Sequence, residues 1–224
     1  MGQYSRNMGI MTEEELLIVE NTRVLLVGVG GLGGFIASSL VRLGVKKLTI
    51  IDFDDFEESN LNRQIFSTTL TLNKSKVDIT KKKLLDINPN IEIIAIHGKY
   101  DRSVNDTIYH DIDVVFDGVD NIESKLLLEE HCTLYNKPLI HGAIGGWYGQ
   151  MGIIMPNSNI LKDIYSTRSK GIEEELKSPT FAPGIVGNMM VSEFLKFILK
   201  KDALVNEILF IDVLDHDYRI IYKK

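Results

Sequence analysis

The sequence predicts an α/β fold: a Rossmann-like, doubly wound, mostly parallel sheet with helices on both faces and an antiparallel C-terminal extension. Two observations predict it. Short apolar runs alternate with segments of helical periodicity between residues 23 and 141, which is the rhythm of βαβ units. A glycine-rich turn also joins the first apolar run to the first long helical segment, as in nucleotide-binding sheets.

The individual elements follow from periodicity and from residues that begin or end them. Thr12 and Glu15 form a capping-box pattern that opens a short helix. Continuous apolar runs predict buried strands, while Gly44 and Pro89 end two helical segments. The predicted strands are residues 23–28, 48–51, 91–96, 113–117, 138–141, 150–155, 208–213 and 218–222, and the predicted long helices are residues 32–44, 75–87, 123–135 and 183–198.

We expect the 224 residues to form one domain, because 44% of them are hydrophobic and can build one substantial core. Its expected parts are an N-terminal helical arm (1–22), a nucleotide-binding core (23–156), a polar loop (157–182), and a C-terminal helix and strand pair (183–224). The loop is long for a compact domain, so we expect it to be either functional or poorly ordered.

Composition argues against several classes of function. The net charge of −6 disfavours a nucleic-acid partner, which requires clustered Lys and Arg. The one cysteine, Cys132, excludes an intrachain disulfide and a multi-cysteine zinc site, and its helical surroundings favour a buried structural thiol. There is no apolar stretch of membrane-spanning length and no apolar signal core at the N-terminus, so we expect a cytoplasmic protein that contacts no membrane.

The glycine-rich turn predicts a nucleotide site. Gly28, Gly30 and Gly33 form a GxGxxG pattern between a strand and a helix, where backbone N–H groups can approach phosphates, and Gly31 lies within it. Asp52 ends the second strand, 19 residues after Gly33, where an acid accepts hydrogen bonds from ribose hydroxyls. To this point the pattern fits NAD as well as ATP.

The segment from residue 52 to residue 64 favours ATP. A dehydrogenase has no evident use for this segment, and no His or Lys is clearly placed for hydride transfer. A triphosphate, by contrast, requires cations along its length. Arg63 offers a fork for phosphate oxygens, and Lys76, at the start of the next helix, supplies a second positive charge.

Two further segments have two interpretations each. Asp120 follows a buried strand and is a natural Mg²⁺ ligand beside phosphates, but Asp120 or Asn121 also suits the N-cap of the helix predicted at 123–135. The two roles are compatible if one residue caps the helix and the other faces the metal. The glycines between His141 and Gly146 either leave room for a thin peptide tail or form a tight bend between strands.

These motifs resemble a known family. The chain is similar, over nearly its whole length, to the MoeB/ThiF/HesA family, the bacterial relatives of ubiquitin-activating enzymes, and within it to the ThiF-type sulfur-carrier adenylyltransferases without zinc cysteines. The resemblance rests on Tyr4-Ser-Arg6-Asn7, the glycine turn 28–34, Asp52-x-Asp54, Ser59-Asn60-Leu-x-Arg63-Gln64, Lys76-Val77, Ile87-Asn88-Pro89, Asp117-x-x-Asp120-Asn121 and the segment 182–187.

The resemblance implies an adenylyltransferase. In such an enzyme the C-terminal glycine carboxylate of a small ubiquitin-like sulfur carrier (ThiS/MoaD-like, ending in Gly-Gly) attacks the α-phosphate of ATP and releases pyrophosphate. A carboxylate is already ionised at neutral pH, so positioning and charge neutralisation suffice. The implied catalytic residues are Arg63, Lys76, Asp120 as the Mg²⁺ ligand, and Arg6, and the implied ATP-binding residues are Gly28, Gly30, Gly31, Gly33, Asp52 at the ribose, Asp54, Ser59, Asn60, Arg63, Gln64, Lys76 and Asn121.

The resemblance also implies a homodimer, in which Arg6 reaches the ATP of the neighbouring subunit, and a loop at 157–180 that crosses over the carrier tail. The chain departs from the family pattern in two respects. It has no Cys-x-x-Cys pairs, so we predict no zinc, and residues 157–184 contain no cysteine for an acyl-disulfide with the carrier. Adenylation is therefore expected, with thiol chemistry left to a partner or a sulfide donor.

Two alternatives stay open. The chain could activate a peptide C-terminus or the carboxylate of a modified tRNA nucleoside, although its acidic charge counts against tRNA. It could also be a nucleotide-binding partner subunit that has lost activity, although the joint presence of Arg6, Arg63, Lys76 and Asp120 counts against that. The carrier itself stays open among the thiamin, molybdopterin and cysteine pathways.

Overall fold

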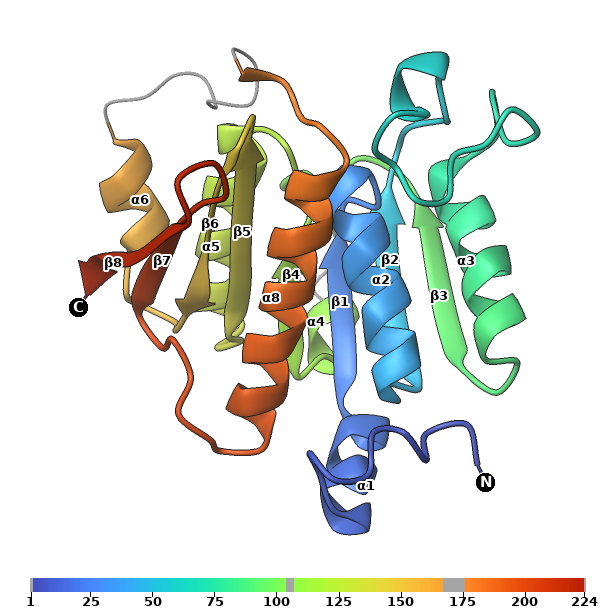
Figure 1. The fold of residues 1–224 in the computed structure, drawn as a ribbon, viewed down its shortest axis with the longest axis horizontal. Coiled ribbons are helices and arrows are strands. Elements are labelled where there is room, and N and C mark those ends of the chain that lie inside the picture. Colours follow the sequence, from blue (N-terminus) through green and yellow to red (C-terminus); the bar gives the residue numbers. More distant parts are fainter. Residues whose placement is uncertain (1, 104–106, 167–175, 224) are drawn as a thin grey trace.

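The computed structural model describes residues 2–103, 107–166 and 176–223. In these residues one sheet of eight strands has the order β3-β2-β1-β4-β5-β6-β7-β8 (Figure 1). The strands are β1 (Arg23–Val27), β2 (Lys47–Asp52), β3 (Glu92–His97), β4 (Val114–Asp117), β5 (Leu139–Gly145), β6 (Tyr148–Ile154), β7 (Glu207–Asp212) and β8 (Asp217–Lys223). Strands β1 to β5 are parallel and β6 to β8 are antiparallel, so the predicted fold class is confirmed.

Helices cover both faces of the sheet (Figure 1). The described helices are α1 (Glu13–Asn21), α2 (Gly31–Leu43), the 3-10 turn η1 (Glu58–Asn60), α3 (Lys76–Ile87), α4 (Thr107–His110), α5 (Ile122–Leu134), α6 (Ile160–Tyr165) and α8 (Phe181–Ile198). One apolar core lies between the sheet and α2, α3 and α8, and a second lies between the sheet and α4, α5 and α6. In the described residues, no helix combines the length and the apolar character that crossing a membrane requires.

Local signals account for the elements that the sequence predicted well. The hydroxyl of Thr12 accepts a hydrogen bond from the Glu15 N–H, and the Glu15 carboxylate accepts one from the Thr12 N–H, so the capping box opens α1 as predicted. Gly44 ends α2 at a φ of 126°, which favours glycine. Apolar side chains on both faces make β1 a strand buried between two layers of helices.

Two predictions about the middle of the chain are wrong. Residues 142–145 were expected after a short strand that ends at His141, but they are part of β5 itself, and of the predicted glycines only Gly146, with a φ of +60°, lies in the turn to β6. The polar stretch 157–180 was expected to lack secondary structure, but it contains α6. Its segment 167–175 lies outside the described residues. The last long helix, α8, also begins at Phe181 rather than at Pro183.

Helix α6 is stabilised by a side chain distant in sequence, which explains why periodicity missed it. Its N-cap residue, Asn159, forms no side-chain cap. Instead, the Glu129 carboxylate on α5 accepts hydrogen bonds from the N–H groups of Leu161 and Lys162, at 2.9 and 3.0 Å. An acceptor for the first N–H groups of a helix normally comes from the sequence just before it. Here it comes from a neighbouring helix.

Candidate active site

A cavity of about 1450 Å³ opens at the carboxyl ends of the parallel strands. It lies where the strand order reverses, since β1 has β2 on one side and β4 on the other. Ligands of open α/β sheets bind at such switch points. The predicted site residues that line it are Gly28, Gly30, Gly31, Asp52, Asp54, Ser59, Arg63, Gln64, Lys76, Asp120 and Asn121.

The glycines of the turn serve two different purposes. A Cβ at Gly33 would lie 1.9 Å from the Gly28 carbonyl oxygen, and one at Gly28, whose φ is +85°, would lie 2.6 Å from the Gly118 oxygen. These two glycines therefore permit close packing of α2, β1 and the loop after β4. Gly30 and Gly31 line the cavity, where their missing side chains leave the backbone open at the start of α2.

Asp52 connects the end of β2 to the glycine turn. Its carboxylate accepts hydrogen bonds from the N–H groups of Val29 and Asp54, at 2.8 and 2.9 Å. Burial raises the pKa of Asp52, and these two hydrogen bonds act in the opposite direction. The carboxylate thus has a fixed orientation beside the turn, as an acceptor for ribose hydroxyls needs.

Lys76 is held at the same edge of the sheet by Asp54. The ammonium lies 2.8 Å from the Asp54 carboxylate, and the Lys76 N–H also donates to the Asp54 carbonyl oxygen. The side chain of Lys76 is only 8% exposed and that of Asp54 is 46% exposed. Since Lys76 also begins α3, its charge and the helix N-terminus both favour an anion at this point.

Arg63 carries a charge that no acidic side chain in the described residues neutralises. One guanidinium nitrogen donates to the Ser59 carbonyl at 2.8 Å and to the Asn62 side-chain oxygen at 2.9 Å, and both acceptors are uncharged. Gln64 lies next to Arg63 and is 7% exposed, and its buried side-chain oxygen has no hydrogen-bond partner in the described part of the chain. The cavity therefore presents the charge of Arg63 beside the open backbone of Gly30 and Gly31, and the Gln64 oxygen is an unpartnered acceptor buried next to it.

Asn60 and Gly33 were predicted in the ATP-binding set but do not line the cavity. Asn60 is buried, and its side-chain oxygen accepts a hydrogen bond from the Glu57 N–H at 3.0 Å. It stabilises the turn η1, whose next residues include Arg63. Gly33 and Asn60 thus stabilise the backbone around the cavity without lining it.

The loop after β4 separates its two polar residues. The Asn121 side-chain oxygen accepts a hydrogen bond from the Ser124 N–H at 2.8 Å and caps α5. Asp120 is exposed, lines the cavity and, in the described residues, forms no ion pair; its carboxylate has only a long contact, 3.4 Å, to the Asn121 amide. Asn121 is therefore the cap and Asp120 lines the cavity, an arrangement in which the two roles are compatible, and the Mg²⁺ role of Asp120 stays a prediction.

Asp120 fits a Mg²⁺ site that is completed by a nucleotide. Mg²⁺ is usually bound by one or two carboxylates together with phosphates and water, rather than by a cage of protein ligands. The described residues contain no cluster of three or more His, Cys, Asp or Glu that could hold a metal without a nucleotide. If ATP binds along the glycine turn, the free carboxylate of Asp120 would bring a metal ion against its phosphates.

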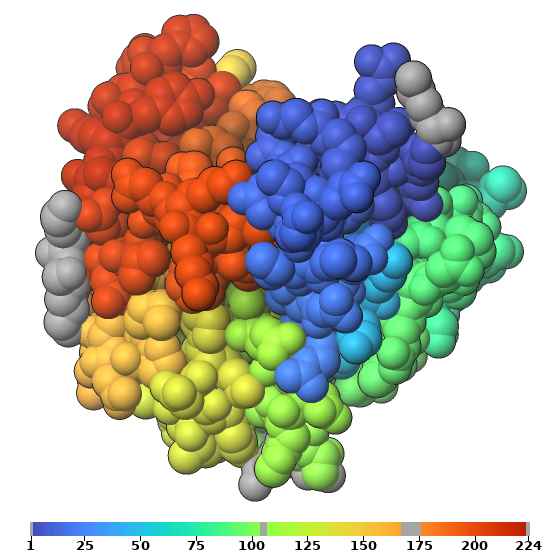
Figure 2. All heavy atoms as spheres, turned by 90° about the horizontal axis from the view of Figure 1, so that it is seen from below, coloured from blue at the N-terminus to red at the C-terminus, as the bar shows by residue number. Residues whose placement is uncertain are grey.

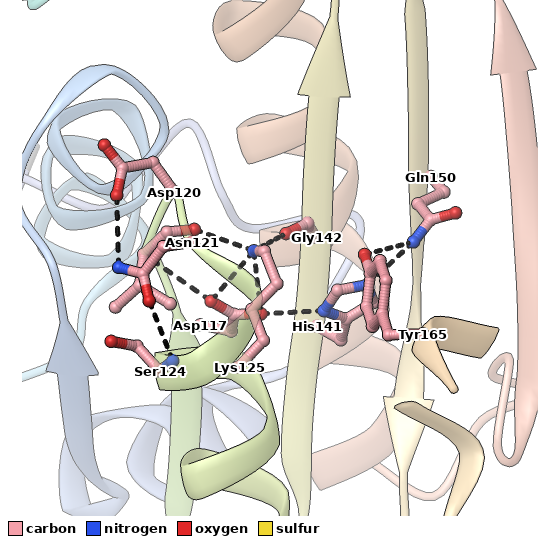
Figure 3. A network of polar contacts seen from close by, with 10 residues as sticks. Asp117, Asp120, Asn121, Ser124, Lys125, His141, Gly142, Gln150 and Tyr165 are labelled. Carbon is pink, nitrogen blue, oxygen red and sulfur yellow. Dashed lines mark hydrogen bonds and ion pairs between the residues drawn. The ribbon is translucent and has the colours of Figure 1, made fainter. Parts of the chain in front are cut away.

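Sequence reasoning missed a buried charge network just below this loop (Figure 3). Asp117 is fully buried and contacts the ammonium of Lys125 at 3.1 Å and His141 Nδ1 at 2.7 Å. Burial alone would raise the pKa of Asp117, but Lys125 and His141 together lower it. Burial lowers the pKa of His141, so the network consists of an ionised carboxylate, an ammonium and a neutral imidazole. A signal was present, because Asp117, Lys125 and His141 are polar residues within apolar elements.

The glycines between His141 and Gly146 have different roles: Gly146, with a φ of +60°, lies in the tight turn between β5 and β6, as one interpretation predicted, whereas Gly142 lies within β5. A Cβ there would lie 2.3 Å from the Met190 sulfur on α8, so the glycine permits close packing of α8 on β5. It leaves room for a helix rather than for a peptide, and it is not at a bend. Cys132 is buried as predicted, and burial raises the pKa of its thiol.

Arg6 lies at the opposite end of the sheet from the cavity. The N-terminal segment packs at the end of α2, where the Asn7 side chain donates to the Leu43 carbonyl at 3.1 Å. Figure 2, which views the molecule from below, shows the N-terminal residues spread over that end. Helix α2 has 13 residues and spans about 20 Å. The exposed Arg6 is thus about that far from the glycine turn of its own chain.

The chain is similar to several known proteins. The model of the ThiF family matches residues 4–224. The chain is 34% identical to a molybdopterin-synthase adenylyltransferase of Haemophilus influenzae, covering 80% of this chain and 75% of that protein. It is 30% identical to a tRNA threonylcarbamoyladenosine dehydratase of Bacillus subtilis, covering 90% and 78%. A crystal structure of E. coli MccB with ATP has the same fold, with a TM-score of 0.79 at 19% identity, over 100% of this chain and 72% of that one.

Proposed function

We propose that this chain, which belongs to the ThiF family and is an adenylyltransferase of the ThiF/MoeB type, activates the C-terminal glycine carboxylate of a small ubiquitin-like sulfur carrier. The observation that carries the proposal is that Arg63 and Asp120 face one cavity beside the glycine turn without neutralising each other. A triphosphate and its Mg²⁺ are the ligands that need a free cation and a free carboxylate together.

The expected reaction assigns a task to each side chain. Asp52 accepts hydrogen bonds from the ribose, and the N–H groups at the start of α2, with Arg63 and Lys76, bind the phosphates. Asp120 would hold Mg²⁺, whose charge offsets that of the leaving pyrophosphate. An oxygen of the carrier carboxylate forms a bond to the α-phosphorus, and the bond between the α- and β-phosphates breaks. No general base is required, because the attacking carboxylate is already ionised.

The path of the carrier tail is suggested by the residues after the undescribed segment 167–175. Lys177 and Ser178 line the same cavity as the glycine turn. The Lys177 carbonyl accepts a hydrogen bond from the Gly146 N–H at 2.8 Å, and the Ser178 carbonyl accepts one from the Asn62 amide at 3.3 Å. This strap passes from the β5–β6 turn toward η1, so a thin tail could pass beneath it to the α-phosphate.

Pyrophosphate exchange tests the proposal. Purified chain, ATP, Mg²⁺ and labelled pyrophosphate are incubated with candidate carriers that end in Gly-Gly, and with the same carriers after removal of the last two residues. We expect label to enter ATP only with an intact carrier. If ATP binds normally but no intact carrier supports exchange, carrier adenylation is wrong and the inactive-subunit alternative is favoured.

A second substrate class has one specific observation in its favour. A relative that is 30% identical is named a tRNA threonylcarbamoyladenosine dehydratase, so activation of a carboxylate on a modified tRNA is the main competitor. The net charge of −6 counts against it, because tRNA binding gains most of its affinity from Lys and Arg at phosphates. ATP consumption that depends on modified tRNA, and not on any carrier, would establish this competitor instead.

We further propose that the chain acts as a homodimer. Arg6 can reach a nucleotide only in another subunit, since it lies at the far end of α2 from the turn of its own chain. Light scattering should give a mass of twice 25.3 kDa. A monomer that retains full activity would contradict both the dimer and the role of Arg6.

A further inference from the structure

Lys125 is a buried lysine to which the proposed reaction assigns no task. The residue lies on α5 and is 1% exposed. Its ammonium lies 3.2 and 3.1 Å from the two carboxylate oxygens of Asp117, 2.7 Å from the Val119 carbonyl and 2.9 Å from the Gly142 carbonyl (Figure 3). A buried ammonium is costly unless acceptors surround it and its charge is balanced. These oxygens meet both conditions, so Lys125 holds a defined position.

Lys125 anchors the backbone on one side of Asp120. The Val119 carbonyl that it binds belongs to the peptide group shared with Asp120. On the other side, Asn121 is anchored by its hydrogen bond from the Ser124 N–H. Both neighbours of Asp120 are thus attached to α5, although the Asp120 side chain points away from Lys125 (Figure 3) and lines the cavity. The direction of that carboxylate therefore depends on the two anchors.

The same ammonium connects this loop to the neighbouring strand. Its contact with the Gly142 carbonyl lies on β5, directly before Ala143 and Ile144, which line the cavity. Lys125 thereby fixes the distance between the loop that carries Asp120 and the cavity wall formed by β5. Lys76, the other buried lysine at this end of the sheet, lines the cavity, whereas Lys125 does not.

The rest of the network holds Asp117, the counterion of Lys125, in place. His141 Nδ1 lies 2.7 Å from an Asp117 oxygen and donates to it. His141 Nε2 then accepts from the Gln150 amide at 3.1 Å, and that amide nitrogen also donates to the Tyr165 hydroxyl at 2.9 Å. The network continues through β5 and β6 to α6, so the position of Asp117 does not depend on Lys125 alone (Figure 3).

We propose that Lys125 is a positioning residue: by holding the Val119 carbonyl, it directs the Asp120 carboxylate to the place where Mg²⁺ bound to ATP must lie. The proposal rests on one part of the proposed function, namely that ATP binds in the cavity with its Mg²⁺ at Asp120. It does not depend on the identity of the carboxylate substrate. A supporting residue of this kind typically changes metal affinity by about 10- to 100-fold when it is removed.

A double-mutant cycle on ATP binding tests this proposal. The cycle compares Lys125→Met in the wild-type chain with Lys125→Met in an Asp120→Ala chain. Removing Lys125 alone leaves the Asp117 carboxylate buried without its counterion, which can unfold the chain. A second series therefore combines Lys125→Met with Asp117→Asn. This pair removes both charges, so ATP binding can be measured on a folded chain. The matched control is Lys196→Met on α8, which also removes a lysine paired with an acidic residue but lies outside the cavity.

The readout is the dissociation constant of ATP, measured by calorimetry with Mg²⁺ and with EDTA, and it needs neither carrier nor turnover. With Mg²⁺, we expect Lys125→Met to weaken binding about tenfold, and with EDTA by less than about twofold. In the Asp120→Ala chain, the same change should cost less than about twofold even with Mg²⁺, because the group that it positions is absent. The combined Lys125→Met and Asp117→Asn variant should show the same losses as Lys125→Met alone, both in the wild-type chain and in the Asp120→Ala chain. Lys196→Met should bind ATP like the wild type.

Two results would overturn the inference. One is an equal loss with Mg²⁺ and with EDTA, which indicates a general disturbance of the cavity. The other is an equal loss in the wild-type chain and in the Asp120→Ala chain, which shows that Lys125 does not act through Asp120. Failure of the proposed function appears separately, as normal Mg²⁺-dependent ATP binding by the wild-type chain with no pyrophosphate exchange.

Discussion

The two ends of the parallel strands carry similar charged side chains in opposite arrangements. At the amino end, Arg23 forms ion pairs with Asp111 and Asp113, at 3.0 and 2.9 Å, so the charges there neutralise one another. At the carboxyl end, Arg63 and Asp120 line one cavity, and in the part of the chain that the structure describes neither forms an ion pair. Although Lys76 is paired with Asp54 at that end, the charges of Arg63 and Asp120 are left for a ligand.

This difference shows how the fold separates stability from function. A charge that is already paired within the protein must lose its partner before it can bind a ligand, which reduces the gain from binding. Arg63 is instead held by uncharged oxygens, and Asp120 is held only through its backbone neighbours. Both side chains keep their orientation without losing their charge, which is the preorganisation that electrostatic catalysis requires.

The largest expected effect comes from removing the carboxylate at the cavity. Asp120→Ala should lower carrier-dependent pyrophosphate exchange by about a thousandfold or more, because the charge of the reacting phosphates then lacks its metal partner. The melting temperature should change little, since Asp120 is exposed and forms no ion pair in the described residues. Exchange rates and thermal unfolding are measured on the same samples.

The matched control is Asp111→Ala, which removes an exposed carboxylate at the amino end of the sheet. It should leave exchange unchanged. If Asp120→Ala keeps near-normal exchange with Mg²⁺, then the free carboxylate at the cavity does not hold the metal. The unpaired charge of Asp120 would then not explain catalysis at the carboxyl end of the sheet.

A smaller effect should separate two arginines. Arg63→Ala should reduce exchange by about a hundredfold, and Arg63→Lys should restore only part of it, because a single ammonium cannot reproduce the planar fork at phosphate oxygens. Arg23→Ala should leave exchange intact and lower the melting temperature by no more than about 3 °C, as for a surface ion pair. Steady-state exchange and calorimetry check both. Equal losses of activity from Arg63→Ala and Arg23→Ala would refute the proposed division of roles.

The sequence predicted the parallel half of the fold and the polar residues of the cavity for a physical reason. Strands buried on both faces have continuous apolar runs, and the residues just after them, such as Asp52 and Asp120, are carried to one edge of the sheet by the topology. Which of Asp120 and Asn121 caps α5 was not decided by residue type, because both side chains can accept the same hydrogen bond.

Features that depend on contacts between distant elements were not predicted. The glycines between His141 and Gly146 suggested either a passage for a peptide tail or a bend, but Gly142 is required by the close approach of Met190 on α8. Helix α6 depends on Glu129 of another helix for its first N–H groups. The network of Asp117, Lys125 and His141 joins three elements whose contact no local pattern records.

The most direct test of the central claim follows an oxygen atom. A Gly-Gly carrier labelled with ¹⁸O in its C-terminal carboxylate is incubated with the chain, ATP, Mg²⁺ and hydroxylamine. Attack on the α-phosphorus places one carboxylate oxygen on that phosphorus, and hydroxylamine then takes the acyl group at carbon and releases AMP. We predict AMP that carries one ¹⁸O, together with pyrophosphate. Unlabelled AMP, or ADP and phosphate as the products, would contradict activation of the carboxylate as an adenylate.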